Sequence, residues 1–325
     1  MELALEILAL LAGFYFLAKG SDWLVTGASV VAERIGVRPL VVGLTVVAWG
    51  TSAPEVVVSG RGALAGEVGV TMGNVLGSNV ANIGLVLGLC TLVLPAVLRE
   101  RLGWREIFWL LASLGILWYG VHDLEVSRLD AALFLGALTV YNLQLLWEAR
   151  QASVGSEPIE PPSDTWWERH PKLSVLIGML AIFLAAEAVM HGAMGLAMRA
   201  GLSTLVISLT VIAVGTSLPE LAAGLSGAFK GHSDISIGNV VGSNVFNLLG
   251  VVGVVGLIHP FGGDQDEPGR EVIRATLELE FPVVLGFSLA AVVLPMVLPG
   301  RGGRLKGAVL FLGWVGYTVY LIQRG

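Results

Sequence analysis

The sequence has few charged residues and almost no cysteine. Asp, Glu, Lys and Arg make up 14% of its 325 residues, whereas a soluble domain has roughly 25%. Hydrophobic residues make up 55%, and the mean hydropathy is +0.79. The one cysteine, Cys90, excludes an intramolecular disulfide and a thiol cluster for a metal. This composition predicts an all-α polytopic protein of the cell membrane.

The sequence also lacks long runs of like charge. The formal net charge of −6 is spread thinly, with no basic block for nucleic acid and no acidic tail. Glu2 and Glu6 stand where a secretory signal peptide carries Lys or Arg, so we expect the first apolar segment to remain as a membrane helix. The expected surrounding is the lipid bilayer, with no nucleic-acid partner and no obligate protein partner.

Apolar segments separated by charged or Gly/Pro-rich breaks predict about ten transmembrane helices. A polar, Pro-rich stretch at 150–172 lies between the fifth and the sixth. Trp166 and Trp167 at its end are expected to anchor the chain at the membrane interface. The predicted spans lie near 3–31, 39–60, 69–98, 105–121, 129–147, 173–198, 204–228, 235–258, 276–298 and 306–322.

Two long blocks of the sequence repeat at an offset of 165 residues. Residues 44–88 and 209–253 align without a gap and share 22 identities in 45 positions. The stretch GTSAPE at 50–55 returns as GTSLPE at 215–220. An internal repeat of this quality indicates a duplicated structural unit. The second shared stretch reads GNVLGSNVAN at 73–82 and GNVVGSNVFN at 238–247.

The duplication defines the predicted domain organisation. Residues 1–149 form the first five-helix repeat, with its block at 43–88. The linker at 150–172 follows, and residues 173–325 form the second repeat, with its block at 208–253. Five crossings separate the two blocks, and this odd number predicts two inverted-topology repeats of five helices.

The distribution of Lys and Arg predicts the orientation. With the amino terminus outside, twelve Lys and Arg fall in inward loops and six in outward loops. Because cytoplasmic loops carry an excess of positive charge, both termini are expected to be extracytoplasmic and the central linker cytoplasmic.

Glu55 lies in the middle of an apolar run long enough to cross a bilayer. An ionisable group there costs several kcal/mol to insert, which makes it a functional candidate. Thr51 and Ser52, four and three residues earlier, share its helix face. Pro54 lacks a backbone donor and would break the helix, loosening carbonyls such as that of Ala48. The sequence therefore predicts a polar, interrupted helix at membrane depth.

Further oxygen donors accompany Glu55. Ser78 and Asn82 are four residues apart and share a helix face. Two carboxylates, two amides, several hydroxyls and freed carbonyls form a set of hard donors that suits Ca²⁺ or Na⁺ rather than zinc or copper. One Ca²⁺ would neutralise the two carboxylates, and competition with Na⁺ or H⁺ for them would give antiport. The second half repeats the set as Thr216, Ser217, Glu220, Ser243 and Asn247.

Other polar and small residues in these blocks have structural interpretations. The glycine pairs at 73/77 and 238/242 are expected to serve helix packing. Interhelical hydrogen bonding is the alternative to ion binding for the four Ser and Asn candidates of the second stretch. Asn79 and Asn244 point away from the preceding serines and are expected to be structural. Asp22 and Glu187 are expected either to pair between the two long helices or to act as proton or regulatory groups.

The two blocks resemble the α-repeats of the sodium/calcium exchanger family, and the resemblance covers nearly the whole chain, as a short prokaryotic member. It implies alternating access by sliding of the first and sixth helices. It also implies ion sites at the midplane, with Glu55 and Glu220 as Ca²⁺ carboxylates. Thr51 and Thr216 would add backbone carbonyls, and Asn82 and Asn247 would lie at the centre. The implied Na⁺ positions are completed by Ser52, Ser78, Ser217 and Ser243 and by the carbonyls of Ala48 and Ala213.

The resemblance predicts a secondary antiporter that exchanges Na⁺ for Ca²⁺, with no cofactor. Asn247 stands where the potassium-dependent branch carries Asp, which argues against K⁺ co-transport. H⁺/Ca²⁺ exchange is the first alternative and a cation channel the second. An enzyme is not expected, because no nucleophile–base set lies among the membrane residues.

Overall fold

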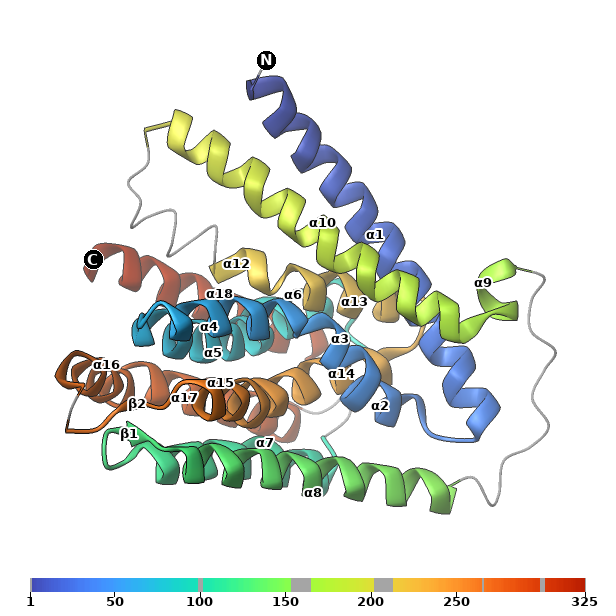
Figure 1. The fold of residues 1–325 in the computed structure, drawn as a ribbon. Coiled ribbons are helices and arrows are strands. Elements are labelled where there is room, and N and C mark those ends of the chain that lie inside the picture. The colour runs from blue at the N-terminus through green and yellow to red at the C-terminus, as the bar shows by residue number, and fades with distance from the viewer. Residues whose placement is uncertain are drawn as a thin grey trace.

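The computed structural model describes residues 2–98, 102–152, 165–201, 213–264, 266–298 and 302–324. These residues are helical apart from short connections and one two-stranded antiparallel sheet (Figure 1). In the sheet, β1 (Glu125–Val126) pairs with β2 (Phe261–Gly262) and so ties one half of the chain to the other.

Interrupted helices alternate with long continuous ones in both halves. The first half contains α1 (Glu2–Ile35), α2 (Pro39–Val42), α3 (Ala48–Thr51), α4 (Ala53–Leu64), α5 (Val68–Ala81), α6 (Gly88–Val93), α7 (Trp104–Val121) and α8 (Arg128–Ala152). The second half contains α9 (Trp166–Arg169), α10 (Pro171–Arg199), α12 (Ala213–Thr216), α13 (Leu218–Phe229), α14 (Ser233–Val245), α15 (Val252–Ile258), α16 (Glu267–Glu278), α17 (Glu280–Val297) and α18 (Gly303–Arg324). Within the described residues, π-helical segments interrupt the α-helices at η1 (Gly43–Val47), η2 (Asn82–Leu87) and η5 (Phe246–Val251).

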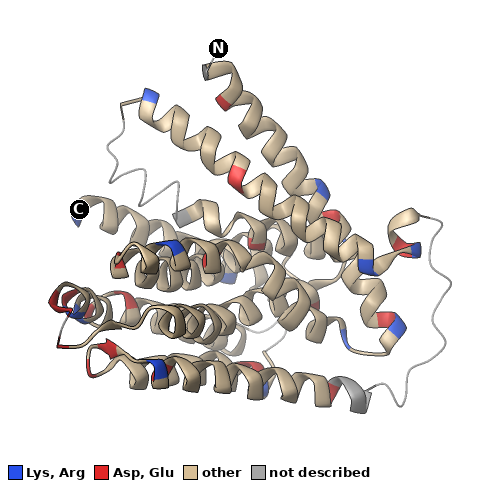
Figure 2. Cartoon of the chain, in the orientation of Figure 1, with Lys and Arg blue, Asp and Glu red and all other residues tan. Residues whose placement is uncertain are grey.

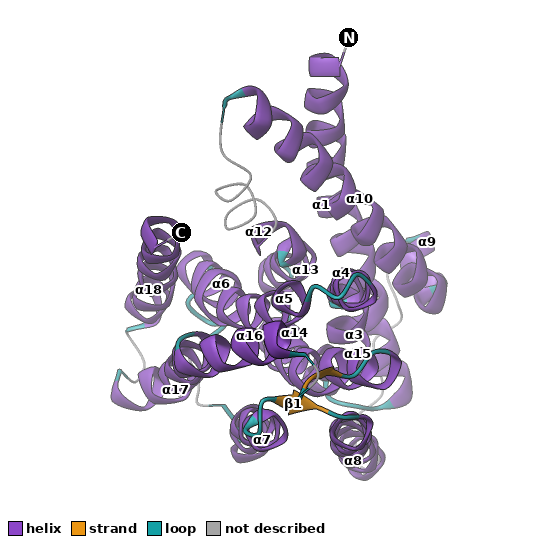
Figure 3. Cartoon of the chain, turned by 60° about the vertical axis from the view of Figure 1, so that its left-hand side comes forward, coloured by secondary structure: helices purple, strands orange, loops and turns teal. Residues whose placement is uncertain are grey.

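Helices α1 and α10 form a long antiparallel pair that projects beyond the rest of the bundle (Figures 1 and 3). Glycines seven residues apart on α1 contact α10, and a glycine later in α1 contacts a residue earlier in α10. A Cβ on Gly13 would lie 3.0 Å from the Ala185 carbonyl, and one on Gly27 would lie 2.6 Å from the Pro171 carbonyl. Such close backbone approach needs residues without side chains, as at many membrane helix interfaces. The two helices that the repeat makes equivalent therefore run in opposite directions.

Each half contains one helix that breaks at the serine of its GTS-x-PE stretch. Helix α3 ends at Thr51, and α4 begins at Ala53 after a bend of 43°. The second break lies at Ser217, between α12 and α13. The backbone angles of the two serines match, with φ −87° and ψ 10° at Ser52 and φ −89° and ψ 2° at Ser217. Because proline two residues later cannot donate to the preceding turn, the sequence dictates a break at both places.

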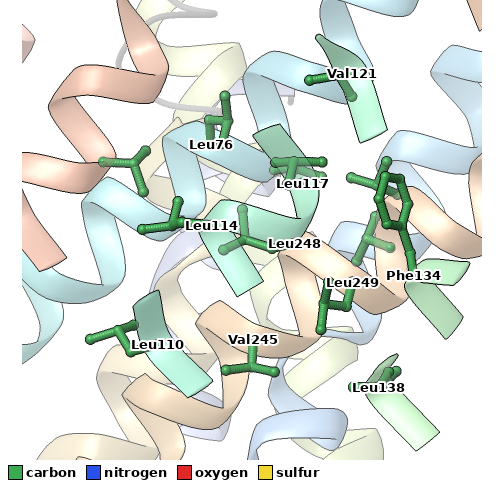
Figure 4. Close-up of a cluster of buried hydrophobic side chains, with 14 of the residues drawn as sticks. Leu76, Leu110, Leu114, Leu117, Val121, Phe134, Leu138, Val245, Leu248 and Leu249 are labelled. Carbon is green, nitrogen blue, oxygen red and sulfur yellow. The ribbon is translucent and has the colours of Figure 1, made fainter. Parts of the chain in front are cut away.

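Helices α7 and α8 lie on the side of the bundle away from α1 and α10 (Figures 1 and 3). Leu110, Leu114, Leu117 and Val121 recur at helical spacing along α7 and are all buried. They form one cluster with side chains from α5, α8, α14 and η5, such as Phe134 (Figure 4). Lipid is as apolar as these side chains, so the cluster holds the helices together by close van der Waals packing rather than by hydrophobic transfer.

Seven helices in the described ranges are long and apolar enough to cross a membrane, and the bent pair α2–α4 would make eight. Charged residues lie mostly at helix ends and in connections (Figure 2). The predicted span near 105–121 is the 18-residue helix α7, which is not among the seven, and the span near 204–228 lies partly outside the described residues. The seven are Leu3–Ile35, Val68–Val93, Arg128–Glu148, Pro171–Arg199, Ser233–Ile258, Glu267–Val297 and Gly303–Arg324.

The end of the predicted linker folds onto the end of α1. Helix α9 follows residues 153–164, which lie outside the described ranges, and its Trp167 stacks on Trp23 of α1 with ring centroids 4.4 Å apart. Arg34 of α1 donates to the Glu168 carbonyl at 2.8 Å. Trp rings are preferred at membrane–water interfaces, so these contacts fit an interfacial position for α9.

Candidate ion-binding site

The two helix breaks bring two carboxylates into the interior of the protein. Glu55 lies in the first turn of α4 and Glu220 in the first turn of α13. Both side chains are fully buried, with 0% exposure. The positive end of a helix dipole favours a carboxylate in the first turn. The breaks therefore place each acidic group where the backbone of its own half-helix stabilises a negative charge.

Hydroxyl groups from opposite halves face each other beside these carboxylates. Thr51 Oγ1 lies 3.5 Å from Ser243 Oγ, and the repeat-related pair, Thr216 Oγ1 and Ser78 Oγ, lies at 3.4 Å. All four side chains are buried. The structure thus brings the GTS-x-PE stretch of each half against the GN-xx-GSN stretch of the other.

The hydrogen bonds of the two carboxylates differ. Oε1 of Glu220 accepts from Ser52 Oγ at 2.8 Å and from Ser243 Oγ at 3.3 Å. Both carboxylate oxygens of Glu55 lack a hydrogen-bond partner in the described part of the chain, and so does the hydroxyl of Ser217, the repeat counterpart of Ser52. The two halves have closely similar sequences, yet among the described residues the carboxylate of Glu220 is hydrogen-bonded and that of Glu55 is not.

Two asparagines of the predicted set lie in the same interior. Asn82 Nδ2 donates to Asn244 Oδ1 at 3.1 Å, across the two halves. Asn247 is fully buried, and neither its oxygen nor its nitrogen has a partner among the described residues. Asn82 begins η2, and Asn247 lies within η5. Single π turns inside α-helices occur frequently at functional sites.

The two predicted alanines lie one turn before the breaks. The carbonyl of Ala48 accepts Ser243 Oγ at 3.4 Å and Thr51 Oγ1 at 3.3 Å, so it faces the polar interior. Ala48 directly follows η1. Ala213 is the first described residue of α12, three residues before Thr216.

Two further asparagines, which the sequence analysis did not single out, support the acidic turns. Asn74 Nδ2 donates to the Glu55 carbonyl at 3.2 Å, and Asn239 Nδ2 donates to the Glu220 carbonyl at 3.3 Å. Asn239 also accepts the Thr51 hydroxyl at 3.0 Å. Both asparagines belong to the repeated GN-xx-GSN stretch, so the repeat itself was the signal that could have identified them.

Several buried polar atoms between the two helix breaks have no hydrogen-bond partner among the described residues. Apart from amide nitrogens, these atoms are oxygens, and oxygen ligands suit Ca²⁺ or Na⁺. Buried polar atoms without partners are costly in a protein and call for a ligand or water. The oxygens of the predicted residues in this state are both of Glu55, Oε2 of Glu220, Oγ of Ser217, and Oδ1 of Asn82 and Asn247.

Glycine packing is confirmed for the second glycine pair. A Cβ on Gly238 would lie 2.6 Å from the Leu40 carbonyl, and one on Gly242 would meet the Leu44 carbonyl at 2.5 Å. Gly73 and Gly77 have nothing within 4 Å of such an atom among the described residues.

The pairing expected between the long helices for Asp22 is wrong. Asp22 of α1 pairs instead with Lys230, which follows α13, at 2.6 Å. Glu187 makes no ion pair within the described part of the chain. The repeat could not reveal the Lys230 contact. The position in the first half that is equivalent to Lys230 is Ala65, which carries no charge.

Comparison with known proteins identifies the family. The profile of the sodium/calcium exchanger protein family matches residues 5–147 and 170–323. The chain belongs to this family. It is 30% identical over 357 residues to the sodium/calcium exchanger MaX1 of Methanosarcina acetivorans, covering 98% of this chain and 99% of that protein. It is 32% identical over 321 residues to the inner membrane protein YrbG of Escherichia coli, covering 96% of each chain.

The fold is similar to that of a solved exchanger. The sodium-calcium exchanger NCX_Mj, in a structure without Na⁺ and Ca²⁺, superposes with a TM-score of 0.77 at 26% identity, covering 98% of this chain and 99% of the other. The predicted resemblance is therefore confirmed. The family is one of transporters rather than enzymes, and membership in it supports a cation/Ca²⁺ antiporter of the membrane.

Proposed function

We propose that this protein exchanges Na⁺ for Ca²⁺ across the membrane by alternating access. The observation that carries the proposal is the pair of buried carboxylates, Glu55 and Glu220, at two helix breaks that meet in the interior. Ionisable groups within membrane segments are expensive and are typical of ion pathways. Two carboxylates match the charge of one Ca²⁺, and monovalent ions competing for the same oxygens would couple the two fluxes.

The proposed Ca²⁺ ligands are the carboxylates of Glu55 and Glu220, with backbone carbonyls of Thr51 and Thr216. Asn82 and Asn247 would lie at the centre of the site. The open oxygens of Glu55 and Asn247 support this assignment, because a bound cation would supply the partner that each lacks. The proposed Na⁺ positions add the hydroxyls of Ser52, Ser78, Ser217 and Ser243 and the carbonyls of Ala48 and Ala213.

We also propose that the chain forms two inverted repeats of five helices, residues 1–149 and 173–325. The antiparallel packing of α1 on α10 supports this topology, because equivalent elements of inverted repeats run in opposite directions. The proposed orientation has both termini outside and the linker at 150–172 in the cytoplasm. The excess of Lys and Arg in the inward loops supports it.

Sliding of the α1/α10 pair over the site would provide the alternating access. The glycines along the α1/α10 contact let the two helices pack closely, so the pair would move as one unit. Helix α1 also packs against α13, and α10 packs against α3 and α12. Movement of the pair would therefore be transmitted directly to both helix breaks.

Flux into liposomes tests the proposal and its alternatives. Purified protein is reconstituted in liposomes loaded with Na⁺, and uptake of radioactive Ca²⁺ is followed after outside Na⁺ is replaced by choline. Uptake that requires inside Na⁺ is the expected result. Uptake that follows a pH gradient and ignores Na⁺ would assign the protein to H⁺/Ca²⁺ exchange. Ca²⁺ currents without counter-ion flux would assign it to the channels.

Variants of the carboxylates test the site itself. Glu55→Gln and Glu220→Gln each keep the side-chain shape and remove one negative charge. Each is expected to reduce Na⁺-dependent Ca²⁺ uptake to background. Glu278→Gln, at the exposed end of α16, serves as the matched control and should transport as the parent protein does. Normal uptake by either site variant would refute the assignment.

We propose that K⁺ is not transported with Na⁺. The only buried carboxylates in the described part of the chain are Glu55 and Glu220. With Asn247 in the interior, the site lacks the further negative charge that an additional monovalent ion would need. The rate of Ca²⁺ uptake should therefore be the same whether choline or K⁺ replaces Na⁺ outside the liposomes, with the membrane potential clamped.

A further inference from the structure

A second feature of the fold lies apart from the helix breaks, where α1 ends and α10 begins. A cavity of about 290 Å³ opens there, between the last turns of α1 and the first turn of α10. This volume is near the lower end of the roughly 300–1,000 Å³ typical of small-ligand sites. None of the proposed ion ligands lines it. The cavity is therefore separate from the candidate ion-binding site.

The cavity has a basic rim and an apolar interior. Arg34, Arg169, His170 and Lys172 line it mainly through carbon atoms and bring their cationic groups to its rim, and the described residues that line it include no Asp or Glu. Val31, Ile35, Pro171 and Leu173 contribute the remaining wall. Figure 2 shows Lys and Arg at the lower end of α1, at α9 and at the start of α10, with Asp or Glu beside them at the first two places. A ligand that fits both surfaces carries negative charge at one end and hydrocarbon at the other.

The start of α10 adds to the attraction for an anion. Its N-cap residue, His170, makes no side-chain hydrogen bond to the first turn. Pro171 has no N–H, and the Ser174 amide donates to the His170 carbonyl. The amides of Lys172 and Leu173 therefore remain uncapped within the described part of the chain. Such amides, together with the helix dipole, favour phosphate groups. Lys172 lies in this same turn and adds a mobile positive charge. The phosphate of an anionic ligand would therefore meet both backbone donors and side-chain cations.

The aromatic residues beside the cavity place it at the level of the lipid headgroups. Trp167 stacks on Trp23 at 4.4 Å, and the Trp166 ring lies 4.9 Å from the His170 ring. Trp is enriched at the boundary between headgroups and hydrocarbon. A cavity at this depth can receive a headgroup and the upper part of an acyl chain from the same leaflet.

We propose that this cavity binds an anionic phospholipid, with its phosphate at Arg34, Lys172 and the start of α10 and an acyl chain against Val31 and Ile35. Basic pockets between membrane helices on the cytoplasmic side are sites for anionic headgroups. The charge complementarity favours an anionic lipid over phosphatidylcholine, whose headgroup carries a compensating positive charge. Since α1 and α10 both contribute to the cavity, the bound lipid bridges the two long helices.

Native mass spectrometry of the purified full-length protein tests the proposal. The detergent-solubilised protein is titrated with phosphatidylglycerol or with phosphatidylcholine of the same chains. We expect one phosphatidylglycerol to bind at least fivefold more tightly than phosphatidylcholine. Equal affinities would overturn the proposal. Glycerol 3-phosphate is titrated as the soluble counterpart, and binding as tight as that of the lipid would assign the cavity to a soluble phosphate compound instead.

Charge variants locate the site. The double variant Arg34→Gln, Lys172→Gln should lose about tenfold or more in phosphatidylglycerol affinity, because each cation near an anionic headgroup contributes severalfold. The exchange Arg34→Lys, Lys172→Arg keeps both charges and should retain binding. The matched control Arg61→Gln, Arg304→Gln removes two exposed cations elsewhere and should bind as the parent does. Unchanged binding by the first double variant, or equal losses in all three, would refute the site. None of these measurements depends on transport.

Discussion

Ser52 donates its hydroxyl hydrogen to Oε1 of Glu220 at 2.8 Å, so the break in one helix holds the carboxylate of the other. Its repeat counterpart, Ser217, makes no hydrogen bond through its hydroxyl in the described part of the chain. Among the described residues, serine at the same place in the motif therefore makes a side-chain hydrogen bond in one half and none in the other. Because of this difference, the contribution of the Ser52 hydrogen bond to stability can be measured by comparing variants of the two serines.

Ser52→Ala and Ser217→Ala should differ in stability without ions. Ser52→Ala removes one of the two donors to a buried carboxylate, which costs about 1–3 kcal/mol. Ser217→Ala removes a hydroxyl without a partner and should leave the unfolding temperature within about 1 °C of the parent. Thermal unfolding in detergent without Na⁺ and Ca²⁺ provides the measurement. Equal losses in the two variants would show that the hydrogen bond to Glu220 contributes nothing.

Gly178→Ala should strongly disturb the pairing of α1 and α10. The added Cβ would lie 2.6 Å from the Leu24 nitrogen and 2.8 Å from the Gly20 carbonyl, and backbone atoms cannot move aside as side chains do. We expect a loss of about 1–3 kcal/mol, as is typical of overpacking. Gly136→Ala on α8 is the control, because nothing lies within 4 Å of its added Cβ. This control should be neutral or up to about 1 kcal/mol more stable through helix propensity. Similar unfolding temperatures for the two variants would contradict the close packing.

Lys230→Met should loosen α1 from the turn after α13. Lys230 pairs with the Asp22 carboxylate at 2.6 Å and donates to the Asp22 carbonyl at 3.0 Å. Because both partners are partly exposed, the loss of global stability should stay below about 1 kcal/mol. Amide hydrogen exchange measured by mass spectrometry should nevertheless become faster in the middle of α1. The control is Arg270→Met, which breaks the ion pair with Asp264 elsewhere in the fold. Unchanged exchange in α1 after Lys230→Met would exclude this tether.

His232 should make the fold sensitive to mild acid. Burial lowers the pKa of His232 below its usual 6.5, the charge of Glu33 acts in the opposite direction, and Lys230 lowers the pKa further. The unfolded chain therefore binds a proton at a higher pH than the folded chain does. The stability from neutral His232 is complete above about pH 6.5 and is lost as the pH falls below it.

Unfolding temperatures at pH 7.5 and pH 5.5 test this expectation. The decrease on acidification should be smaller in His232→Gln than in the parent protein. His259→Gln, which replaces an exposed histidine after α15, should retain the parent's decrease. If the unfolding temperature of His232→Gln decreased as much as that of the parent, His232 would not contribute to the loss of stability in acid.

The sequence predicted the helix breaks and the residues that meet at them. Proline at 54 and 219 forces an interruption, and the duplicated motif shows that the two interruptions belong together. The close approach of Thr51 to Ser243, and of Thr216 to Ser78, is what two interlocking repeats produce. These features follow from local chemistry and from the repeat, and both can be read from one chain.

Other features depend on contacts that one sequence does not show. Asn244 was expected to point away from the preceding serine and to be structural, but its partner could not be predicted: its oxygen accepts a hydrogen bond from Asn82 of the other half. The asymmetry between Ser52 and Ser217 cannot be read from motifs that are identical. The choice of Lys230 as the partner of Asp22 depends on how α13 lies against α1. Each of these results from packing between segments far apart in the sequence.

The π-helical segments were also not predictable. Asn82 to Leu87 and Phe246 to Val251 are apolar apart from one asparagine each, and no residue among them marks a change of hydrogen-bond pattern. A π turn depends on whether the surrounding helices accommodate a wider backbone. The sequence therefore predicted continuous helices where the described residues have the wider segments η2 and η5.

The wider segment η2 lets one residue be lost without moving the helix that follows. A π turn contains one residue more than the α turn that it replaces, while the chain after it keeps its orientation. Deleting one residue from 83–87 and closing the π turn to an α turn would therefore leave α6 in place. Gly88 would keep its contact with α18, where a Cβ on it would lie 2.9 Å from the Phe311 nitrogen, and Cys90 would stay beside Gly224 of α13. The same deletion within α7, which holds no extra residue, would turn the rest of that helix by about 100° about its axis.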